Sequence, residues 1–283
     1  MQKDAQVKRK ATRFTSYNSG YDSGDGEGNF HMRDLLRFLV VDIILLIVVK
    51  LFMWLGFFAT PSQYVLAILG SKVLLFVYLI WLVRAHRDAW PDTGAASIGR
   101  WWAWPLCLLL YIACYPLLVH VDRLNNELLY VVKGLLGFAH IPHPQDVVVL
   151  IFEDIVAMPV RITLVAFSVL IGPFMEELAF RGMGLDAAWR SWGTFWAVLF
   201  TSLMFGVYHF SLDLMIPLVL LGIVFCLVRI ISRSLWCSVL IHSLHNAIAL
   251  SIVAYNAGLL DSLNIPDLLE KYGVPGLLKS LGL

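Results

Sequence analysis

The sequence predicts an all-α protein that forms a polytopic membrane bundle of about seven transmembrane helices. Hydrophobic residues make up 59% of the 283-residue chain, and the mean hydropathy is +0.77. Charged residues make up only 14%, against about 25% in ordinary globular proteins. Several apolar runs approach the ~20 residues that a helix needs to cross a bilayer core. Together these observations indicate a multi-pass membrane protein.

A polar tail at residues 1–37 precedes the first apolar run. Its stretch SYNSGYDSGDGEGN is rich in Gly, Ser and Asp, a composition typical of disorder. Its basic residues, including the KRK stretch, favour a role in membrane topology over nuclear targeting. A secretory signal would place its apolar segment close to the first residue, so no cleavable signal is expected.

Seven spans are predicted from the apolar runs that follow. Their approximate ranges are 38–59, 64–83, 101–120, 155–175, 194–209, 214–231 and 235–255. The segment LNNELLYVVKGLLGF, after the third span, mixes polar and apolar residues, which favours an interfacial amphipathic helix. The predicted parts are a disordered basic cytoplasmic tail, N-terminal membrane helices with the interfacial helix, a membrane core, and a short C-terminal tail: 1–37, 38–154, 155–255 and 256–283.

The distribution of Lys and Arg predicts a cytoplasmic N-terminus. In this orientation fourteen of these residues fall in cytoplasmic segments and four in external ones, as the positive-inside rule expects. Seven spans then place the C-terminus outside, whereas an eighth span within 124–153 would reverse the C-terminal half. The net charge is only +1 and its basic residues are divided among several loops, so no nucleic-acid-binding surface is indicated.

The cysteines indicate neither a disulfide framework nor a zinc knuckle. All four lie inside apolar runs, where cysteine is a small buried hydrophobe, and none has the close spacing of a zinc site. Their positions are Cys107, Cys114, Cys226 and Cys237.

Charged residues inside the spans are costly and therefore mark candidate sites. Asp42 and Lys50 are eight residues apart, about 12 Å along a helix axis, which is too far for them to pair with each other. Each is expected to meet a partner on another helix or to reach the membrane interface. A structural role, either in pairing or near the membrane interface, is favoured over a chemical one for the other such residues: Lys72, Glu153, Asp154 and Arg161.

Two adjacent glutamates stand out in the stretch GPFMEELAFRG, residues 172–182. On a helix, Glu177 and Arg181 are four residues apart and can pair on one face, whereas Glu176 is rotated by about 100°. Two neighbouring carboxylates in a low-dielectric site cannot both ionise cheaply without a compensating charge. One glutamate held by arginine and one left free suits a catalytic base.

Histidines in the last three spans supply further candidates. His209 ends the stretch FGVYH, and His242 and Asn246 are four residues apart in HSLHN, hence on one helical face. A glutamate pair, a histidine and a His/Asn pair thus occur on three hydrophobic segments that could converge. His245 points elsewhere on its helix and is expected to be structural.

These residues resemble a known family, the CAAX proteases and bacteriocin-processing enzymes, also called Abi, which includes the type II CAAX prenyl endopeptidases. The family pattern is EExxxR, then FxxxH, then HxxxN. This chain has Glu176-Glu177-Leu-Ala-Phe-Arg181 followed by Gly182, then Phe205-Gly-Val-Tyr-His209, then His242-Ser-Leu-His-Asn246. All three motifs occur in order on hydrophobic segments, and the resemblance covers about residues 155–255.

The resemblance implies an intramembrane endopeptidase with an all-helical fold and a water-accessible catalytic cavity. Glu176 and His209 would activate the attacking water, and His242 and Asn246 would stabilise the oxyanion. Glu177 and Arg181 would shape the site. These roles are carried over residue by residue from the three motifs.

A metal is the main open point in that chemistry. Glu176, His209 and His242 could form a zinc site with two histidines, one carboxylate and an open position, as a metalloprotease-like reading of the family requires. The chain has no HExxH, and Asn246 suits an oxyanion donor better than a zinc ligand. A mechanism without a cofactor is therefore favoured, with zinc as the alternative.

Two other classes of function are weighed against the protease. A transporter or proton-coupled channel would also place charges in the membrane, but no internal repeat and no paired Gly/Pro-broken spans are visible. A non-catalytic membrane scaffold or immunity protein would keep the motifs. The expected partners are the lipid bilayer and a membrane-associated or lipidated peptide substrate. The compact chain favours a bacterial inner membrane over the endoplasmic reticulum.

Overall fold

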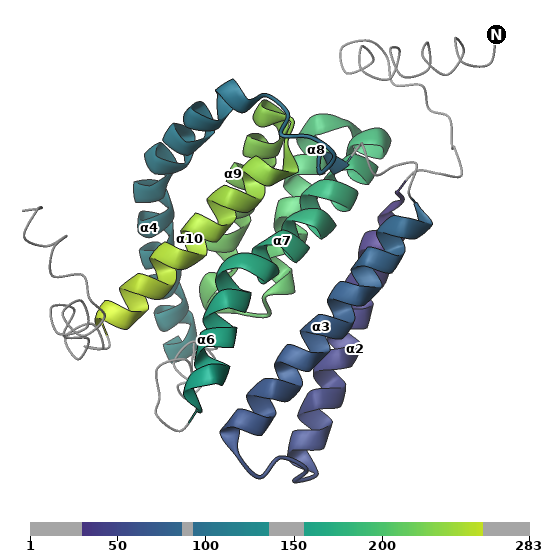
Figure 1. The fold of residues 1–283 in the computed structure, drawn as a ribbon. Helices are drawn as coiled ribbons and strands as arrows, with labels where there is room; N and C mark the ends of the chain where they lie inside the picture. The colour runs from purple at the N-terminus through teal and green to yellow at the C-terminus, as the bar shows by residue number, and fades with distance from the viewer. Residues whose placement is uncertain (1–29, 87–92, 136–155, 257–283) are drawn as a thin grey trace, which may run out of the picture.

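A computed structural model describes residues 30–86, 93–135 and 156–256, and all regular structure within these ranges is helical. The all-α prediction is therefore confirmed. Most of the predicted N-terminal tail, the C-terminal tail, and Glu153 and Asp154 lie outside the described residues. Figure 1 shows the helices as a bundle of long, inclined rods.

The first two helices of the described residues form an antiparallel pair, α2 (Met32–Trp54) and α3 (Pro61–Ala85), which lie side by side in Figure 1. Helix α2 begins inside the predicted tail, because the Asp34 side chain accepts the backbone N–H of His31 at 2.9 Å and caps the first turn. Helix α3 begins at a capping box, in which the Thr60 hydroxyl accepts the N–H of Gln63 at 3.3 Å. Asp42 of α2 pairs with Lys72 of α3, so the expected partner on another helix is confirmed for Asp42.

Helix α4 (Trp104–Leu135) follows a short 3₁₀ turn, η3 (Trp101–Ala103). It has 32 residues, about 48 Å at 1.5 Å per residue, which exceeds the ~30 Å hydrocarbon core of a bilayer. The prediction of a separate interfacial helix from residue 124 onward is therefore wrong for residues 124–135, because these residues continue α4. Between Pro116 and residue 133 the sequence has no Gly or Pro that would end the helix.

A single winding path then carries the chain through the centre of the bundle. It consists of α6 (Met158–Ala166), the π-helical turn η4 (Phe167–Ile171), α7 (Gly172–Glu177), the π-helical turn η5 (Leu178–Gly184) and α8 (Leu185–Tyr208). Gly193, with φ 77° and ψ 173°, divides α8 into two arms. The predicted spans 155–175 and 194–209 lie on the two sides of this turn. The residues between the two predicted spans are also helical, up to the turn at Gly193.

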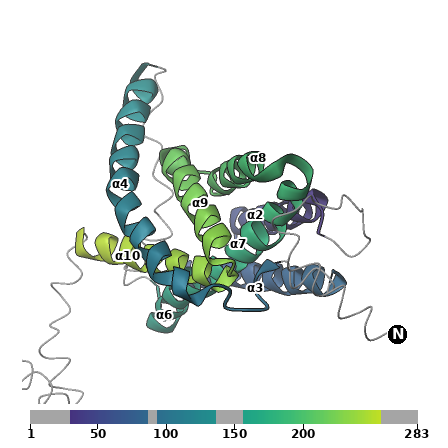
Figure 2. The same ribbon diagram turned by 90° about the horizontal axis from the view of Figure 1, so that it is seen from above.

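The last two helices are α9 (Leu212–Ser232) and α10 (Leu235–Asn256). Helix α9 lies close against α8 because Gly222 has no side chain: a Cβ built there would lie 3.0 Å from Cα of Ser202. The central path contacts α2 on one side and α9 and α10 on the other. Figure 2 shows this order from above, with α4 at the far edge of the bundle.

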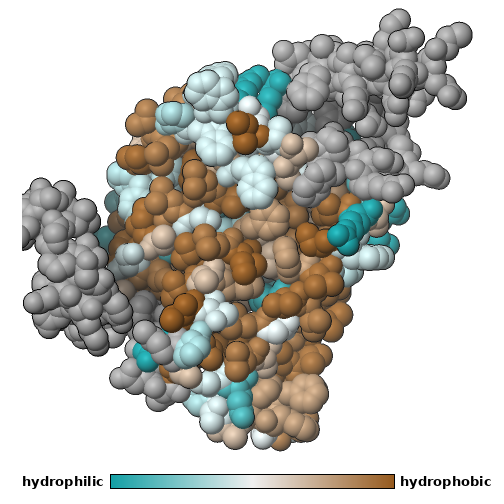
Figure 3. All heavy atoms as spheres, viewed as in Figure 1, coloured by the Kyte–Doolittle hydropathy of each residue, from teal (hydrophilic) through white to brown (hydrophobic). Residues whose placement is uncertain are grey.

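The surface supports a membrane location. Within the described residues, five helical stretches are long and apolar enough to cross a membrane: Pro61–Ala85, Trp101–Val132, Pro159–Tyr208, Leu212–Ser232 and Leu235–Tyr255. The third contains the turn at Gly193 and so covers two predicted spans. Helix α2 is not among the five and carries Arg37, Asp42 and Lys50. Apolar residues cover most of the face in Figure 3. The chain is a multi-pass membrane protein, and the number of crossings stays a prediction.

Candidate active site

The two adjacent glutamates lie at the end of α7, directly before the π-helical turn η5. Glu177 is completely buried, and its carboxylate is surrounded by donors. Oε1 accepts Nη1 of Arg181 at 2.9 Å and Nδ1 of His242 at 2.9 Å, while the Ser238 hydroxyl donates to Oε2. The predicted pair between Glu177 and Arg181 is confirmed. Three donors thus hold the two oxygens of the Glu177 carboxylate, and both oxygens face protein groups.

Arg181 is a buried cation, with only 1% of its surface exposed. Besides Glu177, it donates from Nη2 to the carbonyl of Gly222 at 3.1 Å. Its guanidinium carbon lies 4.3 Å from the ring centre of Phe205 and 5.1 Å from that of Phe225. Aromatic faces attract a cation at these distances. Arg181 therefore ties η5 to both α8 and α9.

Glu176 has a different environment from its neighbour. Its side chain is 22% exposed, and Oε2 lies 3.7 Å from Nε2 of His242 and 3.9 Å from Nε2 of His209. Both distances are longer than a hydrogen bond. The structure thus brings Glu176 and both motif histidines together around one carboxylate oxygen. A contact of this length between polar groups suits a bridging water.

His209 is the C-terminal cap of α8, and its ring is oriented by its own helix. Nδ1 lies 2.8 Å from the carbonyl of Phe205. A carbonyl only accepts, so Nδ1 carries the proton and neutral His209 presents the lone pair of Nε2. That lone pair faces Glu176. The spacing of four residues in FxxxH places the carbonyl of Phe205 beneath the ring.

His242 is almost completely buried, and a different acceptor orients it. Nδ1 donates to the Glu177 carboxylate, and the ring stacks on Phe225 with centres 4.5 Å apart. Nε2 faces Glu176, as it does in His209. The two histidines are therefore chemically distinct, because one rests on a neutral carbonyl and the other on an anionic carboxylate.

Asn246 lies one turn beyond His242 on α10, and its described hydrogen bond runs to the π-helical turn η4. Nδ2 donates to the carbonyl of Ser168 at 2.9 Å. This carbonyl is available because the N–H of Gly172 bonds Phe167 and the next residue, Pro173, has no N–H. The structure therefore places Asn246 on the predicted face and anchors it to the helix that leads to the glutamates.

His245, predicted to be structural, faces away from the glutamates toward α4. Its Nδ1 lies 3.1 Å from the Tyr111 hydroxyl, and its ring packs edge-on against those of Tyr111 and Tyr115.

Three contributors to the site were not predicted from the sequence: Ser238, Phe225 and the carbonyl of Ser168. Ser238 had a visible signal, since Ser238, His242 and Asn246 follow at intervals of four on one face of α10. Phe225 had none, because its contact with His242 comes from a different helix.

The zinc alternative depends on three side chains of the site. Glu176, His209 and His242 are chemically suitable zinc ligands. However, no group of three or more His, Cys, Asp or Glu side chains in the described ranges is placed so that it could hold a metal ion.

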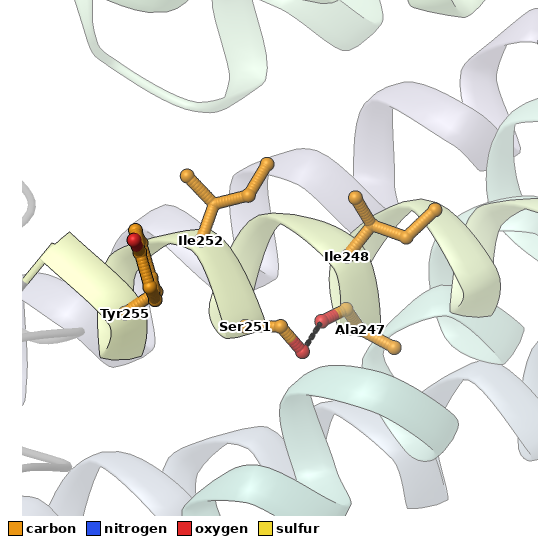
Figure 4. Close-up of a pocket in the computed structure, with 5 residues that line it drawn as sticks. All are labelled: Ala247, Ile248, Ser251, Ile252 and Tyr255. Carbon is orange, nitrogen blue, oxygen red and sulfur yellow. Dashed lines mark hydrogen bonds between the residues drawn. The ribbon is translucent and has the colours of Figure 1, made fainter. Parts of the chain in front are cut away.

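Two hollows lie near the site without including its titratable groups. An apolar groove of about 810 Å³ lies between α3, the start of α4, the η4–α7 segment and α10, and its lining includes Phe76, Trp104, Phe167, Phe174, Trp236 and Leu240. A smaller cavity of about 340 Å³ runs along the end of α10. Figure 4 shows this second cavity, where the Ser251 hydroxyl donates to the carbonyl of Ala247. The rest of its lining consists of Ile248, Ile252 and Tyr255.

Comparison with known proteins agrees with the motifs. Residues 157–248 match the family model for type II CAAX prenyl endopeptidase, Rce1-like. The matched segment runs from α6 into α10 and contains all three motifs, whereas α2, α3 and α4 lie outside it. No curated protein and no solved structure matched the chain. The adjacent glutamates, the two converging histidines and this match lead to one conclusion: residues 157–248 form a Rce1-like domain of the type II CAAX prenyl endopeptidase family, which is a protease family.

Proposed function

We propose that this protein is an intramembrane endopeptidase that hydrolyses a peptide bond of a membrane-associated or lipidated substrate. One observation carries the proposal. Of two adjacent carboxylates in the family domain, Glu177 is saturated by donors, whereas Glu176 faces Nε2 of both His209 and His242. This arrangement supports one carboxylate for catalysis and one for orientation.

Glu176 and His209 would activate the attacking water. Both present proton acceptors to the same space, namely the carboxylate Oε2 and the Nε2 lone pair. General-base assistance of this kind commonly contributes about 10²–10⁴-fold to the rate. As the water oxygen bonds to the scissile carbonyl carbon, its proton passes to this pair. The proton then returns to the leaving amine when the C–N bond breaks.

His242 and Asn246 would stabilise the oxyanion. His242 donates from Nδ1 to Glu177, so the carboxylate can balance the positive charge when Nε2 is also protonated. Asn246 uses one N–H on Ser168 and has a second on the same nitrogen. A preorganised donor to an oxyanion is worth about 10²–10³-fold. Arg181 holds the Glu177 carboxylate in place.

The surroundings suit a substrate that arrives through the membrane. The exposed surface of the described helices is rich in large apolar side chains, so a peptide carrying an apolar anchor could partition into the same phase. We place the protein in a bacterial inner membrane with a cytoplasmic N-terminus, with the endoplasmic reticulum as the alternative location.

The metal-free character of this mechanism has its own test. The purified protein is expected to keep its activity after exhaustive treatment with a strong chelator, and elemental analysis is expected to show no stoichiometric metal. Loss of activity that added zinc restores, with one zinc per chain, would overturn the metal-free mechanism and leave the protease intact.

The proposed function is tested by reconstituting the purified protein in liposomes with membrane-anchored peptides. Cleavage by the wild type, abolished in Glu176→Gln, His209→Ala and His242→Ala, is the expected result. Retention of most activity in any two of these variants would show that the site is wrong. Proton or solute flux without cleavage would favour a transporter, and neither activity would favour a scaffold.

A further inference from the structure

A partly buried ion pair lies beside the site but outside the matched family segment. Asp42 of α2 is 1% exposed, and Nζ of Lys72 on α3 lies 2.7 Å from both of its carboxylate oxygens. The same carboxylate accepts a hydrogen bond from the Tyr208 hydroxyl at the end of α8. Three helices therefore meet at Asp42.

Tyr208 directly precedes His209 and packs against it. The two rings meet edge-on with centres 5.6 Å apart. On other sides, Tyr208 contacts the ring of Phe180 at 5.5 Å and the ammonium of Lys72 at 5.8 Å from its ring centre. Both ends of this side chain are thus held.

The backbone after His209 turns sharply and is held from the opposite side. Phe210 has φ 50°, in the left-handed region, a strained conformation that persists only where its surroundings enforce it. Asn125 of α4 donates to the carbonyls of Leu212 and Asp213, at 3.3 and 2.7 Å. His209 therefore lies on a short turn that is fixed on both sides by N-terminal helices.

We propose that the Asp42–Lys72 pair, acting through Tyr208, positions the His209 imidazole against Glu176. This inference rests on the proposed function. Asp42, Lys72 and Tyr208 are positioning residues, because they act through His209. A displacement of about 1 Å at a catalytic group can cost about 10²-fold in rate, so loss of the hydroxyl's anchor should reduce turnover. Helices α2 and α3 would then complete an active site whose catalytic residues all lie on other helices.

The first variant is Tyr208→Phe, which removes only the hydroxyl and leaves Asp42 paired with Lys72. We expect kcat to fall about 10-fold with KM nearly unchanged, since a displaced His209 slows the chemical step. The thermal unfolding midpoint should change little. Tyr111→Phe is the matched control, because it removes a hydroxyl that pairs with His245 instead, and kcat should not change.

A second variant removes the Asp42–Lys72 pair and replaces it with apolar side chains of similar size. Replacement of a buried ion pair by apolar residues of similar size is often neutral or stabilising, so the double variant Asp42→Leu/Lys72→Met should fold. It is expected to lose kcat to the same extent as Tyr208→Phe. Adding Tyr208→Phe to it should cause no further loss, because the hydroxyl already has no acceptor. Fully additive losses would contradict the proposal.

A third readout requires no substrate. In protein labelled with ¹³C at histidine Cε1, the His209 signal is identified by its absence in His209→Gln. Tyr208→Phe should shift it, whereas Tyr111→Phe should not. If the wild-type protein cleaves no peptide, the proposed function is refuted. In that case, an unchanged His209 signal in Tyr208→Phe would separately refute the positioning role. If the wild-type protein is active and Tyr208→Phe has the same kcat, the positioning role is refuted, even if the His209 signal shifts.

Discussion

Glu176 and Glu177 are adjacent in the chain but differ in almost every physical respect. Glu177 is fully buried and accepts from Arg181, His242 and Ser238, whereas Glu176 is 22% exposed and lies beyond hydrogen-bond distance of either imidazole. The difference follows from the ~100° rotation between consecutive helical residues. Glu177 therefore points inward to Arg181, whereas Glu176 points toward Nε2 of His209 and of His242.

Arg181→Ala is expected to destabilise the protein. The change leaves the buried Glu177 carboxylate without its main cationic partner, a loss that reaches about 3–5 kcal/mol when a buried pair is broken. Thermal unfolding in detergent measures the effect. Arg123→Ala is the matched control, because Arg123 and Glu127 form a pair of the same spacing on an exposed surface, where such pairs contribute little. Normal stability with reduced activity in Arg181→Ala would indicate a substrate contact instead.

Asn246→Ala is expected to lower kcat by about 10²-fold, the effect of losing one oxyanion donor, with KM nearly unchanged. Asn246→Asp should be at least as damaging at neutral pH, because it removes the N–H that bonds Ser168 and places negative charge near the oxyanion. Steady-state kinetics on a cleavable peptide measures both variants. His245→Gln, on the same helix but facing α4, should leave kcat unchanged. Near-normal turnover in Asn246→Asp would contradict the oxyanion role.

Much of this residue-level arrangement could be predicted from local spacing. The pair Glu177–Arg181 and the common face of His242 and Asn246 both follow from helical periodicity. The contacts of Phe225 with His242 and of Tyr208 with Asp42 could not be predicted, because they join residues far apart in the sequence. Local periodicity says which way a side chain points on its own helix, and tertiary packing decides what it meets there.

At the scale of elements, the path from α6 to α8 determines where the glutamates, Arg181 and His209 lie relative to one another. Two π-helical turns, η4 and η5, flank the short α7 that carries the glutamates. Such turns are frequent at functional sites. Here η4 frees the carbonyl of Ser168 for Asn246, and η5 carries Arg181. The path reverses at Gly193, which brings the second arm of α8, and with it His209, back to the glutamates.

Gly193→Ala is expected to destabilise the protein by about 1–3 kcal/mol, since its φ of 77° and ψ of 173° belong to a region that glycine alone adopts readily. A Cβ at Gly193 has no neighbour within 4 Å, so any cost comes from the backbone. Gly70→Ala is the matched control, because Gly70 also has open space but lies inside α3 with helical backbone. Equal unfolding midpoints for the two variants would refute the argument.

Helix positions were predicted better than helix ends. Each apolar run in the described residues coincides with a helix, since an apolar run in a membrane protein must satisfy its backbone internally. The segment after residue 124 was misassigned because its mixed composition resembles an interfacial helix, although no residue in it breaks α4. The predicted fourth span ended at residue 175, although helical structure continues through Leu178–Gly184. The single charged residue of this stretch, Arg181, is buried against Phe205 and Gly222.

At the scale of the whole molecule, the family match and the site do not have the same extent. The match ends at α6 on its N-terminal side, but α2 and α3 reach the site through Asp42 and Lys72, and α4 reaches the turn after His209 through Asn125. The apolar outer surface surrounds a polar cluster that is largely buried. This combination is what hydrolysis within a membrane requires, namely a dry exterior and a few preorganised polar groups.

The most direct test of the protease assignment compares membrane-peptide termini in cells that produce the wild type and cells that produce Glu176→Gln at equal abundance. Glu176 makes no hydrogen bond to either imidazole, so the variant should fold and insert normally. The account predicts a defined set of new termini from membrane-associated proteins in wild-type cells and none of them with Glu176→Gln. Identical sets of termini in the two, with both proteins correctly inserted, would contradict it.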